Sequence, residues 1–172
     1  MSSLSIHRAT LDNADLAYAL VEEYFQTASV VVRESRTQFE RDYFPANAGL
    51  WLATADNLVA GCIALRELRS GGAVLGEIKR MYVRPAYRGR GVGDALLHAL
   101  EAHAARCGYR ELVLDTTDEM ISAIRLYERN GYTRRKRYNQ NPQATIFMGK
   151  EISHSACSER VNQQTAEALD AG

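Results

Sequence analysis

One segment constrains the fold of this chain more than any other. Residues 77–83 form a strand pattern, Pro85 breaks it, and a helical pattern begins almost at once near residue 91. Three evenly spaced glycines lie at this junction: Gly89, Gly91 and Gly93. Glycine adopts backbone angles that other residues avoid, and it lets a ligand approach the main chain closely. The segment therefore predicts a strand, a tight turn and a helix in direct succession.

The same turn has the chemistry of an anion site. Backbone N–H groups at the start of a helix form a concave, electropositive surface. Three arginines add positive charge beside it: Arg84, Arg88 and Arg90. No Gly-Lys-Ser/Thr follows, so the turn is not a P-loop, and its Gly-x-Gly-x-Gly spacing differs from the dinucleotide fingerprint. We expect a phosphate-bearing ligand, which the turn alone does not identify.

The remaining patterns predict a mixed α/β domain. We expect strands at residues 5–9, 50–54, 58–68, 74–83, 112–114, 132–138 and 145–152. Helices are expected at residues 12–25, 33–43 and 91–107, and a fourth runs to residue 130 after a capping box formed by Thr116 and Glu119. Turns at residues 56–57 and 70–72 make residues 50–83 an antiparallel meander. A strand–helix–strand unit inside a mostly antiparallel sheet follows from this order.

Two motifs resemble one known family. Arg88, Gly91 and Gly93 fit the Arg/Gln-x-x-Gly-x-Gly/Ala signature of the GNAT superfamily of N-acetyltransferases, within the longer run Val83-x-Pro85-x-Tyr87-Arg88-Gly89. The later run Ala123-Ile124-x-Leu126-Tyr127-Glu128-x-x-Gly131-Tyr132 is similar to a second family segment, in the right order and at the right separation. The resemblance covers residues 50–152.

The resemblance implies a fold and a cofactor. The fold is a mostly antiparallel central sheet with flanking helices, in which residues 77–83 and 112–115 form a parallel pair that splays apart. The pantetheine arm of acetyl-CoA would enter the gap between them and bond to the backbone of Met81 and Val83. The cofactor-binding residues carried over are Met81, Tyr82, Val83, Arg88, Gly89, Arg90, Gly91, Val92 and Gly93.

The resemblance also suggests two catalytic residues. In many relatives, the tyrosine that matches Tyr127 protonates the departing CoA thiolate. Glu77 lies four residues before Met81, where some lysine-acetylating relatives carry a catalytic carboxylate. An amine is mostly protonated at neutral pH and must lose a proton before it attacks, so we expect Glu77 to act as the base through water. By the two-residue period of a strand, we expect Glu77 on the same face as Met81 and Val83.

One position departs from the family pattern. Met120 stands where many relatives have an asparagine that contacts the cofactor. The four histidines have no ligand-like spacing, so no metal site is expected. The acceptor should be selected by residues 26–48 and by the loop at residues 138–144, whose polar residues could shape a pocket.

Composition narrows the function further. The chain has 21 basic and 21 acidic residues, a balance that argues against bulk binding to nucleic acid or to an anionic membrane. We therefore expect acetyl transfer from acetyl-CoA to a primary amine, with a small molecule favoured as acceptor. A protein lysine or N-terminal acyltransferase and a non-catalytic CoA-binding regulatory module remain alternatives. A homodimer is also possible, because edge strands of this fold often pair.

The predicted domain covers residues 1–152, and a polar tail at residues 153–172 is expected to be flexible. We find no signal-peptide pattern and no apolar run long enough to cross a bilayer. The three cysteines are scattered and show no metal-type spacing. A cytoplasmic protein without structural disulfides is the expectation.

Overall fold

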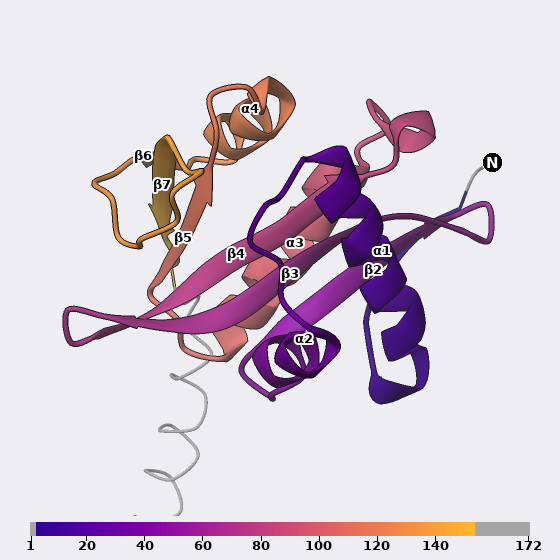
Figure 1. Cartoon of the computed structure of the whole chain (residues 1–172), viewed down its shortest axis with the longest axis horizontal. Coiled ribbons are helices and arrows are strands. Elements are labelled where there is room, and N and C mark those ends of the chain that lie inside the picture. Colours follow the sequence, from indigo (N-terminus) through magenta and orange to yellow (C-terminus); the bar gives the residue numbers. More distant parts are fainter. Residues whose placement is uncertain (1–2, 154–172) are drawn as a thin grey trace, which may run out of the picture.

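The computed structural model describes residues 3–153 and contains seven strands and four α-helices (Figure 1). The strands are β1 (Leu4–Arg8), β2 (Gly49–Ala55), β3 (Leu58–Ser70), β4 (Ala73–Val83), β5 (Glu111–Thr116), β6 (Thr133–Arg134) and β7 (Ile146–Glu151). The helices are α1 (Ala14–Thr27), α2 (Arg36–Tyr43), α3 (Val92–Arg106) and α4 (Ile121–Arg129). Two 3₁₀ turns, Leu11–Asn13 and Pro85–Tyr87, precede α1 and α3.

All seven strands form one sheet in the order β1-β2-β3-β4-β5-β7-β6. Every neighbouring pair is antiparallel except β4 and β5, which are parallel. Helices α1 and α2 cover one face of the sheet, and α3 lies behind the other (Figure 1). Each face has its own apolar core, because the side chains of a strand point alternately to the two sides. The predicted mixed α/β architecture is confirmed.

The parallel strands β4 and β5 pair over only part of their length. Strands β4 and β5 pair only from Gly76–Ile78 to Leu112–Leu114, although β4 continues to Val83 and β5 to Thr116. Beyond Ile78 and Leu114 the two strands diverge, and Figure 1 shows the opening between them. The expected splayed parallel pair is therefore present, and the strand edges that face each other across it have no ladder partner there.

A β-bulge in β4 changes which side chains share a face. The register between β3 and β4 shifts between Cys62 and Ala64, opposite Arg80, whose φ of 56° lies in the left-handed region. Because a bulge inserts one extra residue, the alternation of side chains restarts after it. Met81 and Val83 thus pack against the core beneath α3 and α4, whereas Glu77 points to the α2 side and contacts Arg66. The prediction that Glu77 shares a face with Met81 and Val83 is wrong for this reason.

Two further predictions need correction. The strand expected at residues 132–138 is reduced to Thr133–Arg134, because the segment then leaves β7 and folds toward the opening between β4 and β5. The capping box expected at Thr116 is absent, because Thr116 still pairs with Ile146 in the sheet and α4 begins after Met120 without a side-chain cap. The predicted tail lies outside the described residues, apart from residue 153.

Candidate active site

The glycine-rich turn leads directly into α3, as the sequence predicts. Gly89 and Gly91 have φ values of 72° and 77°, a conformation that strains any residue with a side chain. An added Cβ at either position would meet no heavy atom within 4 Å, so the main chain there is open to a ligand. At Gly93 the requirement for glycine is close packing, because an added Cβ would lie 3.3 Å from Cδ2 of Leu126 on α4.

The three arginines of this segment have different surroundings. Arg84 points back to α1, where its guanidinium holds both carboxylate oxygens of Glu23, so its charge is already paired. Arg88 is exposed, and its Nε donates to the carbonyl oxygen of Val83 at 3.0 Å, which ties the turn to the end of β4. Arg90 is exposed and lies over the ring of Tyr87. Arg88 and Arg90 are therefore the two that remain available to an anion.

A cleft of about 1050 Å³ occupies the opening between β4 and β5. Its walls come from the end of α1, the loop before α2, β4, the start of α4 and the loop before β7. Met81 and Tyr127 line it, and so does Met120, at the position that departs from the family pattern. Glu77 does not line it, although it lies directly beneath residues that do.

Tyr127 projects from α4 into this region. Its side chain is almost fully buried and packs edge-on against Tyr132, with ring centroids 5.4 Å apart. Among the described residues, no side chain or backbone group forms a hydrogen bond with its hydroxyl. Burial raises the pKa of Tyr127 above its ordinary value, and Tyr24 and Asp115 add to the effect. The phenol is therefore neutral, carries its proton, and is not committed to a partner within the described part of the chain.

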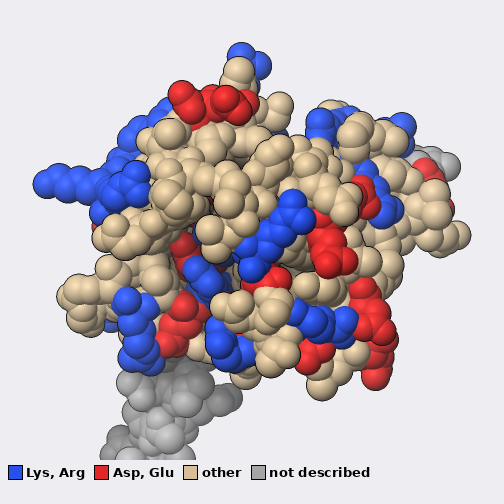
Figure 2. Space-filling model, in the orientation of Figure 1, with Lys and Arg blue, Asp and Glu red and all other residues tan. Residues whose placement is uncertain are grey.

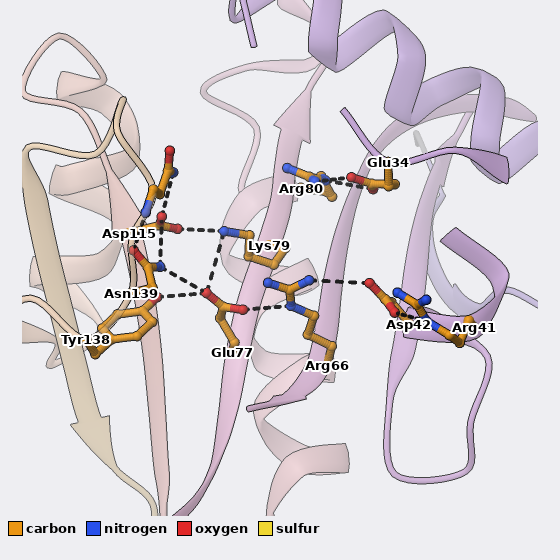
Figure 3. Close-up of polar contacts among 11 residues, drawn as sticks. Glu34, Arg41, Asp42, Arg66, Glu77, Lys79, Arg80, Asp115, Tyr138 and Asn139 are labelled. Carbon is orange, nitrogen blue, oxygen red and sulfur yellow. Dashed lines mark hydrogen bonds and ion pairs between the residues drawn. The ribbon is translucent and has the colours of Figure 1, made fainter. Parts of the chain in front are cut away.

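Glu77 lies at the centre of a polar network that joins β3, β4 and β5 with the loop before β7 (Figure 3). Its carboxylate is fully buried, and Nε of Arg66 donates to Oε2 at 2.7 Å. The other oxygen accepts from the Tyr138 hydroxyl at 3.1 Å and from the Asn139 amide at 3.4 Å, with Lys79 Nζ 3.6 Å away. A buried carboxylate needs such partners, because an unpaired charge inside a protein is strongly unfavourable.

A second ion pair joins the two strands where they separate. Lys79 on β4 donates to Asp115 on β5 at 2.7 Å, just beyond the last paired residues of the ladder. The amides of Asn139 and Asn141 also donate to Asp115, at 3.1 and 2.7 Å. Burial alone would raise the pKa of Asp115, but the charge of Lys79 and these hydrogen bonds outweigh it and lower the pKa. Asp115 is therefore ionised, and the pair fixes the point from which the cleft opens.

The third ion pair was not predicted from the sequence. Arg80, on the bulge, forms a two-point contact with Glu34 in the loop before α2, and its guanidinium lies 4.7 Å from the ring centre of Phe25. Both side chains are almost buried and line the cleft. The only sequence signal was the run of two basic residues, Lys79 and Arg80, in a strand whose one other charged residue is Glu77.

The two loops expected to shape the acceptor site do meet at the cleft. From the loop before β7, the Gln143 side chain accepts a hydrogen bond from the backbone N–H of Val31 at 3.0 Å. Its amide nitrogen donates to the carbonyl oxygen of Ser29 at 3.3 Å. One side chain thus joins the two loops across the cleft. Residues 26–35 and 139–145 both contribute to the cleft walls.

Two kinds of feature are absent from residues 3–153. No group of three His, Cys, Asp or Glu side chains in this part of the chain is arranged to hold a metal ion. None of its helices combines the length and the apolar character that a membrane span requires.

Comparison with known proteins agrees with this geometry. Residues 15–132 match the model of the acetyltransferase (GNAT) family. An uncharacterized N-acetyltransferase of Schizosaccharomyces pombe is 31% identical over 160 residues, which is 88% of this chain and 97% of that protein. An IAA acetyltransferase of Azospirillum brasilense is 30% identical, over 76% of this chain and 95% of its own length.

Solved structures show the same fold. A GNAT-family acetyltransferase from Staphylococcus aureus superposes with a TM-score of 0.73 at 18% identity, over 88% of this chain and all of that one. A structure from Salmonella typhimurium that contains acetyl-CoA has a TM-score of 0.70 at 21% identity, over 90% of this chain and 97% of its own. The family match, which spans more than half of the chain, and the similarity to the yeast protein lead to one conclusion: the chain belongs to the GNAT family of acetyltransferases.

Proposed function

We propose that this protein transfers an acetyl group from acetyl-CoA to a primary amine. The observation that carries the proposal is the position of Tyr127. The side chain is buried, its hydroxyl has no hydrogen-bond partner among the described residues, and Tyr127 lines the cleft together with Met81, where β4 and β5 have separated. In the reaction, a nitrogen–carbon bond forms, the carbon–sulfur bond of the thioester breaks, and the products are an amide, CoA thiol and a proton.

The residues present fit acetyl-CoA. Gly89 and Gly91 leave the main chain open before α3, and the exposed side chains of Arg88 and Arg90 are available to the phosphates. The unpaired edge of β4 near Met81 offers backbone hydrogen bonds to the amide-rich pantetheine arm. When bound, acetyl-CoA supplies the activated acetyl group. The binding residues are those carried over from the family motif: Met81, Tyr82, Val83 and the turn at residues 88–93.

Tyr127 is proposed as the general acid. Because its pKa is raised, the phenol keeps its proton across the neutral and mildly alkaline range and can donate it to the departing sulfur. Its ring is held by Tyr132 and by the core beneath α4, so the hydroxyl has a fixed position.

Glu77 is proposed to act from beneath the cleft. A proton transfer from the acceptor to Glu77 through water would require a water molecule to enter a layer already filled by Arg66, Asn139 and Lys79. These three residues line the cleft, and Glu77 holds all of them. We therefore favour a positioning role over the role of base, and the pH dependence of a Glu77 variant separates the two.

Two measurements test the proposed function. The first is a thermal-unfolding screen with acetyl-CoA, CoA, ATP and NAD. A ligand present at one hundred times its dissociation constant stabilises the folded state by about 2.7 kcal/mol, which raises the Tm by roughly 5–10 °C for a domain of this size. The second is an amine-panel assay that detects free CoA thiol. Stabilisation by CoA without acetylation of any amine would identify a binding module instead of an enzyme.

A further inference from the structure

The acceptor end of the cleft carries one cation that is not matched by an acid. Four basic side chains line the cleft: Arg33, Arg66, Lys79 and Arg80. The last three form ion pairs with buried or half-buried carboxylates. Arg33 forms no ion pair with any carboxylate among residues 3–153. The charge of Arg33 is therefore uncompensated in this part of the structure.

Arg33 is an exposed residue, but contacts with the main chain and with an aromatic ring orient its side chain. Its Nε donates to the carbonyl oxygen of Val30 at 2.9 Å, and Nη2 reaches the carbonyl oxygen of Phe25 at 3.5 Å. Its guanidinium lies 5.7 Å from the centre of the Phe25 ring, which Arg80 also contacts. Two guanidinium groups thus lie near one ring, and the single carboxylate of Glu34 is engaged by Arg80. A guanidinium fixed in this way loses little freedom when it binds a carboxylate.

Another part of the cleft lining carries negative charge. Asp118 and Glu119, in the loop between β5 and α4, line the cleft and form no ion pair with any described residue. Asp118 accepts a hydrogen bond only from the hydroxyl of Thr145 in the described part of the chain. Figure 2 shows that basic and acidic side chains adjoin each other in the middle of this face and do not form separate patches. The cleft therefore presents unmatched positive and negative groups to the same ligand.

One side chain also bridges the cleft. The Gln143 side chain joins the two loops that face each other across it. The volume of about 1050 Å³ has to admit the acetyl-bearing end of the pantetheine arm as well as the acceptor. The cleft volume lies at the upper limit of the roughly 300–1,000 Å³ that suit small organic ligands, and the acetyl-bearing end takes up part of it. A small acceptor fits this space better than a folded protein surface does.

The geometry points to a small zwitterionic acceptor, an amino acid or a close analogue, whose carboxylate binds Arg33 while its amine is acetylated. This inference rests on the proposed acetyl transfer and goes further, because it names the acceptor class and a specificity-determining residue. Arg33 would recognise the carboxylate by charge-assisted hydrogen bonds, and the acidic side chains of the loop between β5 and α4 would attract the ammonium group.

The test compares matched substrates in one assay. Free amino acids, their carboxamides and an N-blocked, C-amidated lysine peptide are offered with acetyl-CoA, and free CoA thiol is measured. For the wild-type protein, we expect kcat/KM for the best amino acid to exceed that for its carboxamide by at least tenfold. Arg33→Gln should lower this ratio to near one, since hydrogen bonds to charged groups are worth roughly tenfold to hundredfold in affinity. Arg33→Lys should restore part of it.

A matched control removes a distant arginine. Arg69→Gln takes away one exposed positive charge at the end of β3, outside the cleft lining, and should leave the ratio unchanged. Affinity for acetyl-CoA should stay equal in all variants, which excludes a purely structural effect of Arg33. The ratio is measured within each variant, so any loss of folded protein cancels.

Several results would overturn the inference. Equal activity on acids and carboxamides, or faster acetylation of the lysine peptide, would refute the acceptor class while leaving acetyl transfer intact. A ratio that survives Arg33→Gln would remove the role of Arg33. Failure of every amine to react would refute this inference and the proposed function together.

Discussion

Replacing Tyr127 by phenylalanine separates a catalytic hydroxyl from a structural tyrosine. The substitution removes one oxygen and keeps the ring, so the edge-on contact with Tyr132 at 5.4 Å is retained. The hydroxyl has no hydrogen-bond partner among the described residues, so its removal leaves no buried group unsatisfied there. We expect the free energy of unfolding to change by less than about 0.5–1 kcal/mol, because no hydrogen bond is lost in that region.

Turnover should respond very differently. If the hydroxyl protonates the departing sulfur, its loss should lower kcat by roughly 10²-fold or more, the usual contribution of a general acid. The dissociation constant for acetyl-CoA should stay within about twofold, since a contact made only in the transition state does not change ground-state binding. Steady-state release of CoA thiol gives kcat, and calorimetric titration gives the affinity.

Tyr132 provides the matched control. Its hydroxyl donates to Oε1 of Glu101 at 2.9 Å, and Lys150 Nζ donates to the same Glu101 oxygen at 2.9 Å. Tyr132→Phe should therefore destabilise the fold by about 1–2 kcal/mol, or roughly 2–8 °C in Tm, while kcat stays near the wild-type value. Normal kcat in Tyr127→Phe would refute the assignment, and so would a loss of stability equal to that of Tyr132→Phe without a kinetic effect.

Three other substitutions follow from the site. Glu77→Gln removes the charge that holds Arg66 and should destabilise the fold by about 1–3 kcal/mol. If the variant's pH–rate profile still falls at acidic pH as the wild-type profile does, Glu77 has a positioning role. If that acidic decrease is lost, Glu77 is the base. Asp115→Asn should lower stability at pH 7. Because the pKa of Asp115 is lowered on folding, its contribution is present above about pH 4 and is lost at lower pH, so urea denaturation at pH 7, 5 and 3.5 should show the two proteins converging. Gly91→Ala should cost about 1–2 kcal/mol through its positive φ and weaken acetyl-CoA binding; Gly72→Ala, with a φ of 81° in the distant β3–β4 turn, should show a similar loss of stability with unchanged affinity.

The elements that depend on local chemistry could be predicted from the sequence. The turn at Asp56 and Asn57 was expected from residue type, and both residues adopt positive φ. Gly108 ends α3 in the left-handed conformation, as expected for a residue that follows a helix. In these cases, the side chain or its absence determines the backbone conformation without help from distant residues.

The structure of the segment after β6 could not be predicted from local sequence patterns. Residues 132–138 were expected to form a strand, yet the ladder with β7 covers only Thr133–Arg134 and is followed by one backbone hydrogen bond from Arg135 to Phe147. Tyr138 turns toward Glu77, and the guanidinium of Arg137 donates to the carbonyl oxygens of Asn141 and Ala144. These contacts join positions far apart in the chain or stabilise an irregular loop, so no periodic pattern records them. The proposed acceptor side of the site depends on this segment, which explains why the sequence predicts residues for the cofactor side in more detail.

The bulge at Arg80 explains how the charged residues of β4 and the apolar Met81 come to lie on different sides of the strand. With regular alternation, Glu77 and Lys79 would face α1 and α2, and the next residue, Arg80, would point into the apolar core beneath α3. Burying an unpaired guanidinium there would be far more costly than one left-handed residue. The extra residue places Arg80 beside Glu34 and returns Met81 to the apolar side. Two consecutive basic residues in a buried strand therefore require the bulge, and the bulge separates a charged acceptor side from an apolar side at Met81, where the proposed acetyl transfer takes place.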